Sequence, residues 1–494
     1  MELLQSWLFY AALLVNARAV FKLLIDWKGM LTTCRFVRRA YAAIDALPDE
    51  AELEADDRAP VFVHLVAAYQ EPDIAGTLRA LLASRYPHGK LQIVVLTREE
   101  EECAPHPLMD VSTAEAVRRL RSELPPYQQK MLTLLVMPGP GRKAEQLNWA
   151  LRPEHLLAVL GDDYPRERVL VGVSDADSIP DSNVLRWIAA EELAGRTGEA
   201  YQGVTLSFAN FERLSLRGRV CAIQQSSIFV RVTIARLINE ARRAHLYERF
   251  AARLPRLARA VRPVFELCFR RSQICLGHNQ FVRLPVLEEL GGFPVLGATE
   301  DSTLGYLLGA RGVLIRPVPI IELTDLPETP QKLVNQNARW YKGVLDDIPV
   351  LWRLWRARPT AFNAAQLCRH VGNKVVEWPI AALVYPVVGF LGWHLAHRYT
   401  HRPLLFFVSV AMPTLSLILS IVVGGIVTQD LLESLRPYLP RSINIARTTW
   451  QAKLVGIFRS QSYWLLATRG AWRVLLSLCR HGHFTLAKTD RVTR

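Results

Sequence analysis

Cysteine is scarce in this chain, and its few cysteines are spread along it without pairing. Seven of the 494 residues are cysteines, and none of them forms a C-x-x-C pair. Structural zinc sites and the disulfide frameworks of small secreted domains both need cysteines in closely spaced patterns. The sequence therefore predicts reduced, cytosolic thiols rather than a disulfide framework or a zinc site.

Nucleic-acid-binding motifs, internal repeats and low-complexity segments are also absent from the sequence. This matters because a formal net charge of +14 suits either nucleic acid or an anionic membrane surface. The basic residues cluster beside apolar stretches, which favours a membrane and no nucleic-acid partner. Residues 231–271 form an arginine-rich segment with a helical pattern, for which a solvated face and contact with anionic lipid headgroups are both open.

Charged side chains are missing from two apolar stretches in the C-terminal part of the chain. Residues 378–395 and 404–427 contain no Asp, Glu, Lys or Arg. A spanning helix needs about 20 apolar residues, so both stretches are predicted to be transmembrane helices. Residues 7–25 are also apolar but contain two basic residues, which leaves a spanning helix and an interfacial helix as alternatives.

Basic residues follow the first of these segments and the last one, whereas the connector between the two C-terminal spans holds only two arginines. The positive-inside rule therefore predicts a multi-pass protein of the inner (plasma) membrane, with the central domain and tail in the cytoplasm. We expect five parts: an N-terminal membrane or interfacial helix and linker (1–57), an α/β domain (58–335), interfacial helices (336–376), two transmembrane helices (377–427) and a basic tail (428–494).

The α/β domain shows short apolar runs that alternate with helical patterns. Strands are predicted at 61–68, 91–97, 131–137 and 168–174, with a helix at 73–84 between the first two. Alternation of this kind is typical of a parallel α/β sheet with right-handed connections.

Two aspartates, Asp175 and Asp177, directly follow the last of these strands. Ligands of open α/β sheets bind at the carboxyl ends of the strands, and paired carboxylates there suit Mg²⁺ or Mn²⁺. The alternative is an Asp-containing turn before the helix that Pro180 opens.

Further motifs surround this D-x-D in a fixed order. They are AAYQEPD (67–73), GRKAEQLNWAL (141–151), GHNQFVRLPVLEELGGFP (277–294), TEDSTLGYLLGARG (299–312) and QNARW (336–340). Together they resemble the family-two glycosyltransferases with the GT-A fold, specifically the membrane-bound branch that includes cellulose and hyaluronan synthases. The resemblance runs from about residue 60 to 345, and residues 463–489 resemble the tail of bacterial members. It implies a Rossmann-like mixed sheet flanked by helices.

The resemblance also implies roles in binding a nucleotide-sugar donor. Asp177 together with Asp175 would hold the Mg²⁺ or Mn²⁺ ion that neutralises the leaving diphosphate. Tyr69 and Glu71 match positions that contact the nucleoside, and Lys143 matches a lysine near the diphosphate. The alternatives are ordinary strand-to-helix punctuation for the first pair and a solvated side chain for the lysine.

Gln336, Arg339 and Trp340 share one face of a predicted helix. The resemblance assigns Arg339 to the diphosphate, and Gln336 and Trp340 to the acceptor; the alternative is an aromatic and basic belt at lipid headgroups. His278 lies on a loop expected near the acceptor. It could contact the acceptor there, and a structural hydrogen-bonding role is the alternative.

The T-E-D motif supplies Glu300 and Asp301 as the candidate catalytic carboxylates. Inversion by direct displacement needs a base for the acceptor hydroxyl, and the resemblance places Asp301 there, with Glu300 as the next candidate. An Asp N-cap for the following helix is the alternative for Asp301.

Two departures from the family pattern affect the function. Many relatives carry an aspartate at the end of the second strand to bind the base, but residues 94–102 (VVLTREEEE) offer Thr97 and four glutamates. Two or three spans are also too few for a polymer channel within one chain. The leading hypothesis is an inverting hexosyltransferase that uses a UDP-sugar and a lipid-linked or membrane-proximal glycan. A processive polysaccharide synthase with partner membrane proteins, and an inactive membrane receptor or scaffold, are the alternatives.

Overall fold

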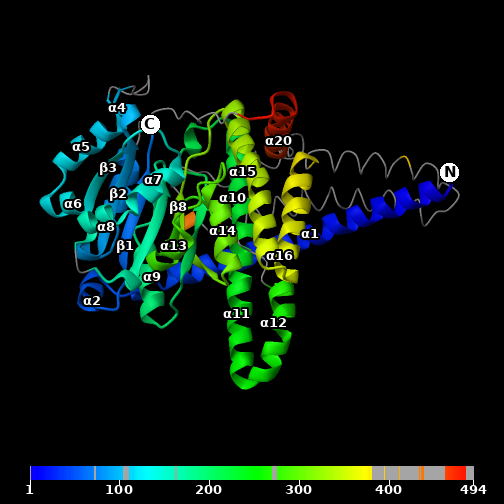
Figure 1. Cartoon of the computed structure of the whole chain (residues 1–494), viewed down its shortest axis with the longest axis horizontal. Helices are drawn as coiled ribbons and strands as arrows, with labels where there is room; N and C mark the ends of the chain where they lie inside the picture. Colours follow the sequence, from blue (N-terminus) through cyan, green and yellow to red (C-terminus); the bar gives the residue numbers. More distant parts are fainter. Residues whose placement is uncertain are drawn as a thin grey trace.

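The computed structural model contains one eight-stranded mixed sheet with helices on both faces and a group of long helices beside it (Figure 1). Its strand order is β3-β2-β1-β4-β7-β6-β8-β5. The structure describes residues 2–71, 74–103, 111–161, 164–269, 275–380 and 462–484, together with 394, 411, 433 and 436–438.

The first half of the sheet is parallel. It contains β1 (Val61–Ala67), β2 (Leu91–Arg98), β3 (Leu132–Met137) and β4 (Val169–Asp175), and β1 lies between β2 and β4. Strands β1, β2 and β4 are short apolar runs that are mostly buried on both faces, as interior parallel strands require, whereas β3 at the end of the sheet is only partly buried. The four predicted strands are confirmed, with ends that differ by one residue.

The second half of the sheet contains antiparallel pairs, so the sheet as a whole is mixed, as the resemblance implies. Strand β7 (Gln280–Arg283) runs antiparallel to both β4 and β6 (Ala200–Leu206). Strand β8 (Ile315–Leu323) is parallel to β6, and β5 (Ile179–Pro180) pairs antiparallel with β8. The strands predicted to be parallel all lie in the first half of the sheet, where that arrangement is confirmed. Strand β7 begins where β4 ends, with Gln280 paired with Val173.

Helices cover both faces of the sheet because successive apolar side chains of β1 and its neighbours point to opposite faces. Phe62 and Val66 face α3 (Ile74–Leu82), α5 (Thr113–Glu123) and α9 (Val184–Leu193). Val63 and Leu65 face the other layer. That layer contains α7 (Lys143–Ala150), α8 (Pro153–Leu160), α10 (Leu216–Ile228), α13 (Leu284–Leu290) and α14 (Glu300–Ala310). Short helices α2 (Glu50–Ala55), α4 (Glu99–Cys103) and α6 (Pro126–Met131) lie at the edges.

Longer helices form a second body beside the sheet (Figure 1). They are α11 (Ala235–Arg253), α12 (Pro255–Phe269), α15 (Pro330–Ala357), α16 (Ala361–His370) and α20 (Ser462–His481). Helix α15 packs along α20, and Gly470 permits the closest approach. A Cβ atom at Gly470 would lie 2.8 Å from the Ala338 nitrogen and 2.9 Å from the Val334 oxygen.

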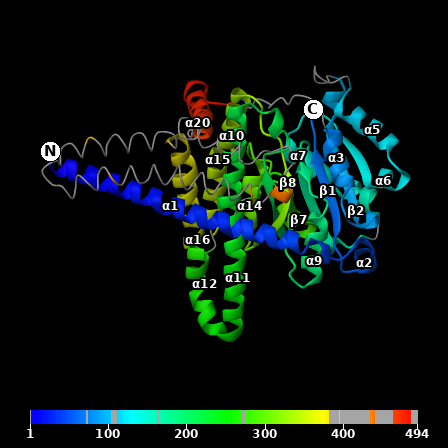
Figure 2. The same cartoon turned by 180° about the vertical axis from the view of Figure 1, so that it is seen from behind.

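Helix α1 (Glu2–Ala42) joins the two bodies. Its C-terminal part is buried through Met30 and Cys34, whereas its N-terminal part leaves the body (Figure 2) and exposes Trp7, Tyr10 and Leu14. Within the parts of the chain that the structure describes, no helix combines the length and apolarity needed to cross a membrane. The predicted spans at 378–395 and 404–427 lie almost entirely outside the described residues. In the described part of the chain, the cysteines at 221, 275, 368 and 479 are free thiols.

Candidate active site

The two aspartates of the D-x-D motif lie where the central strand β4 ends. Asp175 is the last residue of β4, paired in register with Ala67 of β1. The turn that follows is fixed because the Thr77 hydroxyl donates to the Ala176 carbonyl at 2.7 Å, and the Ser178 amide donates to the Asp175 carbonyl at 3.0 Å. This turn buries Asp177 and leaves the Asp175 side chain one-third exposed. Both carboxylates therefore belong to the carboxyl edge of the sheet.

Lys143 connects α7 to this edge. Its Nζ lies 2.6 Å from Asp175 Oδ1, 2.5 Å from the Gly277 carbonyl oxygen and 3.4 Å from Glu300 Oε1. Burial alone would lower the pKa of this lysine, but the carboxylates of Asp175 and Glu300 outweigh it and raise the pKa. Lys143 therefore keeps its positive charge. The N-terminus of a helix repels a cation, and the two carboxylates offset that repulsion.

Glu300 and Asp301 occupy the first turn of α14. The N-cap of this helix is Thr299, so the interpretation of Asp301 as the N-cap is wrong. Asp301 Oδ1 accepts a hydrogen bond from the Ser302 amide at 2.7 Å. Burial, and after it the neighbouring charge of Glu300, raises the pKa of Asp301 from 3.8 to about 6.

Three of the candidate side chains converge on Gly277. A Cβ atom placed there would lie 3.2 Å from Lys143 Nζ, 3.3 Å from Asp301 Oδ2 and 3.5 Å from Glu300 Oε1. The turn before β7 thus passes directly over the lysine and the two carboxylates. A side chain at this position would fill the space in which they meet.

Helix α15 holds the T-E-D turn in place. Asp347 accepts hydrogen bonds from the hydroxyls of Ser302 at 2.6 Å and Thr303 at 2.7 Å, and Asp346 accepts one from the Ala298 amide at 3.1 Å. Asp347 is buried. Sequence reasoning did not identify these two aspartates, although adjacent acidic residues within an amphipathic helix were a usable signal.

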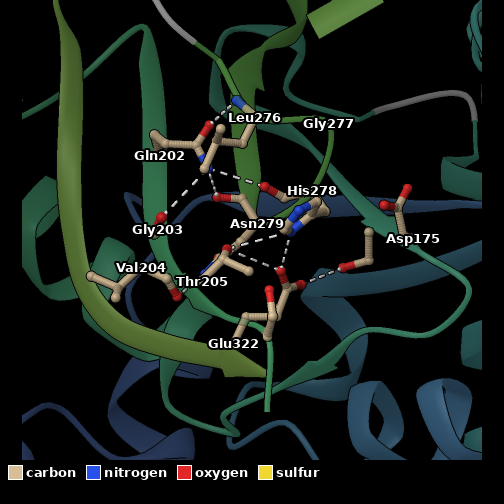
Figure 3. A network of polar contacts seen from close by, with 12 residues as sticks. Asp175, Gln202, Gly203, Val204, Thr205, Leu276, Gly277, His278, Asn279 and Glu322 are labelled. Carbon is tan, nitrogen blue, oxygen red and sulfur yellow. Dashed lines mark hydrogen bonds and ion pairs between the residues drawn. The ribbon is translucent and has the colours of Figure 1, made fainter. Parts of the chain in front are cut away.

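A buried polar network supports His278 (Figure 3). His278 Nδ1 lies 2.6 Å from Glu322 Oε2, and Glu322 Oε1 accepts a hydrogen bond from the Ser174 hydroxyl at 3.2 Å. Although burial opposes the charge of His278, Glu322 raises its pKa to about 9. The imidazole therefore carries a positive charge at neutral pH. Glu322 was not identified from sequence; its signal is a lone carboxylate within the apolar strand β8.

The same network continues to His64 on β1. His64 Nε2 lies 2.8 Å from the Ser174 hydroxyl, and burial lowers the pKa of this histidine to about 4. His64 is thus neutral, in contrast to His278, and its position beneath the sheet edge indicates a structural role.

Asn279 and Gln202 shape the loop that carries His278 (Figure 3). Asn279 has a positive φ of 49°, and its side chain donates to the Val204 carbonyl at 3.2 Å. A Cβ atom at Gly203 would lie 2.1 Å from the Asn279 side chain, so only glycine fits there. Gln202 accepts from the Leu276 amide at 2.7 Å and donates to the His278 carbonyl at 3.0 Å. Asn279 therefore has a structural role.

The loop after β1 places Tyr69 beside the end of β2. The Arg98 guanidinium lies 3.5 Å from the centre of the Tyr69 ring and donates to the Gly141 carbonyl at 2.9 Å. The Glu71 amide donates to the Thr113 hydroxyl at 3.0 Å. Thr97 is buried at the position where many relatives carry an aspartate. Sequence reasoning missed Arg98, which follows Thr97 directly.

Gln336, Arg339 and Trp340 lie on α15 and are half-buried. Together with Gly343 they fall on one side of this helix by their spacing. A Cβ atom at Gly343 would lie 2.0 Å from Thr299 Oγ1, so this side faces the T-E-D turn. Among the described residues, no hydrogen bond or ion pair joins these three side chains to the carboxylates of the D-x-D or T-E-D motifs.

Comparison with known proteins decides the family. Residues 59–343 match the model of the family described as glycosyltransferase like family 2. The chain belongs to this family. The match contains every candidate residue from Tyr69 to Trp340. No curated protein matches the chain.

Several solved structures are similar to this family 2 protein at low identity. One is the mannosyltransferase PcManGT from Pyrobaculum calidifontis in complex with GDP-Man and Mn²⁺, with 16% identity, TM-score 0.40, and coverage of 93% of this chain and 99% of that chain. Another is S. aureus TarS 1–349, with 14% identity, TM-score 0.35 and coverage of 76% and 92%. A TarS 1–349 complex with UDP-GlcNAc has 13% identity, TM-score 0.32 and coverage of 77% and 92%. Because these TM-scores are low, the assignment rests on the family match.

The two aspartates of this glycosyltransferase fit a divalent cation that the substrate helps to bind. Among the described residues, no group of three or more His, Cys, Asp or Glu side chains could hold a metal ion. Mg²⁺ in phosphate-transfer sites is commonly held by one or two carboxylates, with phosphate and water oxygens as the other ligands. Asp177 and Asp175 supply that number of carboxylates at the edge where the diphosphate is expected.

Proposed function

We propose that this glycosyltransferase is an inverting hexosyltransferase that moves a sugar from a UDP-sugar to a lipid-linked or membrane-proximal glycan. The observation that carries the proposal is the convergence of Lys143, Glu300 and Asp301 on Gly277, beside Asp175. A base and a cationic site for a leaving diphosphate are thereby adjacent. Inversion by direct displacement needs both groups at once.

In this proposal Asp301 takes the proton of the acceptor hydroxyl while its oxygen attacks the anomeric carbon. The bond to the diphosphate breaks in the same step, and the electron pair leaves with the diphosphate. Lys143 and protonated His278 stabilise the negative charge that develops there. Arg339 on α15 would contact the diphosphate, as the resemblance implies. A divalent cation at Asp177 and Asp175 would add Lewis-acid stabilisation. Tyr69 and Glu71 would contact the nucleoside.

The acceptor side of the proposal rests on α15. Trp340 offers an aromatic face to a sugar, and Gln336 lies one helical turn away on the same side. The Q-x-x-R-W pattern supports membership of the membrane-bound branch that includes cellulose and hyaluronan synthases. We place the enzyme in the plasma membrane with its catalytic domain in the cytoplasm, because of the apolar stretches at 378–395 and 404–427.

The test is turnover of a panel of nucleotide sugars by purified protein with Mn²⁺, comparing the wild type with Asp301→Asn. We expect release of UDP from at least one donor, and a loss of at least about 10²-fold in the variant, since an amide cannot act as the base. Donor affinity should change little, and the melting temperature at neutral pH should rise because the variant removes a buried charge. The matched control is Asp57→Asn, which changes an exposed aspartate outside the site. Wild-type rates in Asp301→Asn would transfer the assignment to Glu300.

The length of the product distinguishes this function from a processive synthase. A single added sugar per acceptor supports the proposal, whereas a polymer ladder on a gel supports a synthase that works with a partner channel. Binding of a nucleotide sugar without any turnover would support the scaffold alternative.

A further inference from the structure

Helices α11 and α12 form a hairpin that projects away from the sheet and the other helices (Figure 1). Only its base is anchored. Leu237 and Ile238 are buried in the core, and Arg369 of α16 donates to the Leu267 carbonyl at 2.8 Å. None of the candidate catalytic residues lies on the hairpin, so the active site does not explain its presence.

Contacts between the two helices fix the shape of the hairpin. The Tyr247 hydroxyl donates to the Ala258 carbonyl at 2.7 Å, and the Tyr247 and Phe265 rings stack with centroids 4.5 Å apart. Ala258 is buried between the helices. The hairpin therefore presents its far end in a defined conformation.

Exposed leucines and arginines alternate at this far end, residues 246–257, which we name the hairpin tip. Leu246, Leu254 and Leu257 are 61%, 50% and 51% exposed. Arg249, Arg253 and Arg256 are exposed among them. Solvated charged surfaces do not need three large apolar side chains in such a short segment.

The positive charge of the hairpin is poorly compensated. Residues 235–269 contain eight arginines and three glutamates, with no lysine or aspartate. Glu240 is buried, Glu266 pairs with Arg262 at 3.0 Å, and Glu248 lies beside His245. Within the described part of the chain, the three tip arginines make no ion pair.

We propose that the hairpin tip binds an anionic phospholipid surface, with its arginines at the headgroup phosphates and its leucines inserted below them. Guanidinium groups suit phosphate oxygens, and apolar side chains beside them are what interfacial helices insert. Single-stranded nucleic acid would instead need exposed aromatic rings for stacking, but Tyr247 and Phe265 stack on each other. In Figure 1 the hairpin runs crosswise to α1. If α1 enters a membrane end-on, the long axis of the hairpin is therefore parallel to the membrane surface.

This function is additional to the proposed sugar transfer and is tested without any measurement of turnover. Full-length protein is placed in nanodiscs of phosphatidylcholine, or of phosphatidylcholine mixed with phosphatidylglycerol. Amide hydrogen exchange is then followed for peptides from the tip and from the central sheet. The test variant is R249Q/R253Q/R256Q, and the matched control is R118Q/R119Q/R121Q on α5, which lies far from the hairpin (Figure 1).

We expect the tip amides to exchange at least about five-fold more slowly with phosphatidylglycerol present, the effect of roughly one arginine near an anionic surface. The tip variant should lose this protection, the α5 control should keep it, and the sheet should be unchanged in all three proteins. L246S/L254S/L257S should lose it too. Equal exchange in both kinds of nanodisc, or equal protection of the tip by soluble heparin or RNA without lipid, would overturn the proposal.

Discussion

Glu300 and Asp301 are neighbours in sequence but differ in their surroundings. Glu300 lies 3.4 Å from the ammonium group of Lys143, whereas Asp301 is held by the Ser302 amide and has a raised pKa. A carboxylate with a raised pKa is a stronger base, and one with a pKa of about 6 is still ionised at neutral pH. The surroundings of the two carboxylates therefore favour Asp301 as the residue that abstracts the proton.

The pH dependence of turnover follows from the pKa of Asp301. This pKa is about 6, so the base is protonated and inactive below that pH, and kcat/KM should rise through pH 6 toward a plateau. Glu300→Gln removes a neighbouring negative charge, which lowers the pKa and should shift the acidic limb to lower pH. A pH profile of kcat/KM for both proteins checks this. A limb that does not move, or moves upward, contradicts the assignment.

The same pKa predicts an effect on stability. The folded pKa is raised above the unfolded value of 3.8, so the folded state binds the proton more tightly. Stability is then lost as pH rises from about 4 to about 6. Asp301→Asn should accordingly raise the melting temperature at neutral pH, relative to the wild type. A variant that is inactive but has a higher melting temperature has lost catalysis and not its fold.

Asp177 is the residue on which the proposed cation depends most. Asp177→Asn should abolish Mn²⁺-dependent nucleotide binding because a neutral amide is a poor ligand for a hard cation. Isothermal titration with UDP, with and without Mn²⁺, checks this independently of turnover. Asp57→Asn is the control. Nucleotide binding that is equally tight with excess chelator would show that the cation is not required.

Among contacts between helices, the packing of α15 against α20 can be tested with a single substitution. Gly470→Ala would place a methyl group against the backbone of Val334 and Ala338, so the helices must separate. We expect a loss of about 1–3 kcal/mol of unfolding free energy, the usual effect of overpacking, together with reduced turnover. Gly372→Ala is the control, because nothing lies within 4 Å of its Cβ position. Thermal unfolding of both variants measures the difference.

Some elements were predictable from sequence, and others depended on distant contacts. Strands β1 and β4 were predicted because each is an apolar run that must be buried. The antiparallel direction of β7 was not predictable, since four residues of strand carry no information about where the chain has returned from.

The candidate site shows the same division. The D-x-D and T-E-D motifs were found because their residues are adjacent in sequence. Glu322 and Asp347 were missed because their partners, His278 and Ser302, lie more than forty residues away. Such buried pairs form only when the strands and helices are assembled.

At the scale of the whole molecule, the sequence predicts attachment to a membrane. The apolar stretches at 378–395 and 404–427 should make the protein resist extraction by alkaline carbonate. The 428–494 tail should be protected from protease added outside intact cells. Release of the protein into the soluble fraction, or cleavage of the tail from outside, would contradict the proposed topology.

The adjacency of β6 and β7 has a consequence for how this protein can vary. These two strands are hydrogen-bonded neighbours, although α10 and the whole hairpin of α11 and α12 lie between them in sequence. The chain departs from the sheet and returns to almost the same place, so the length of the excursion does not set the strand register. Shortening or exchanging the outer part of the hairpin should therefore leave the turn at Gly277 in place.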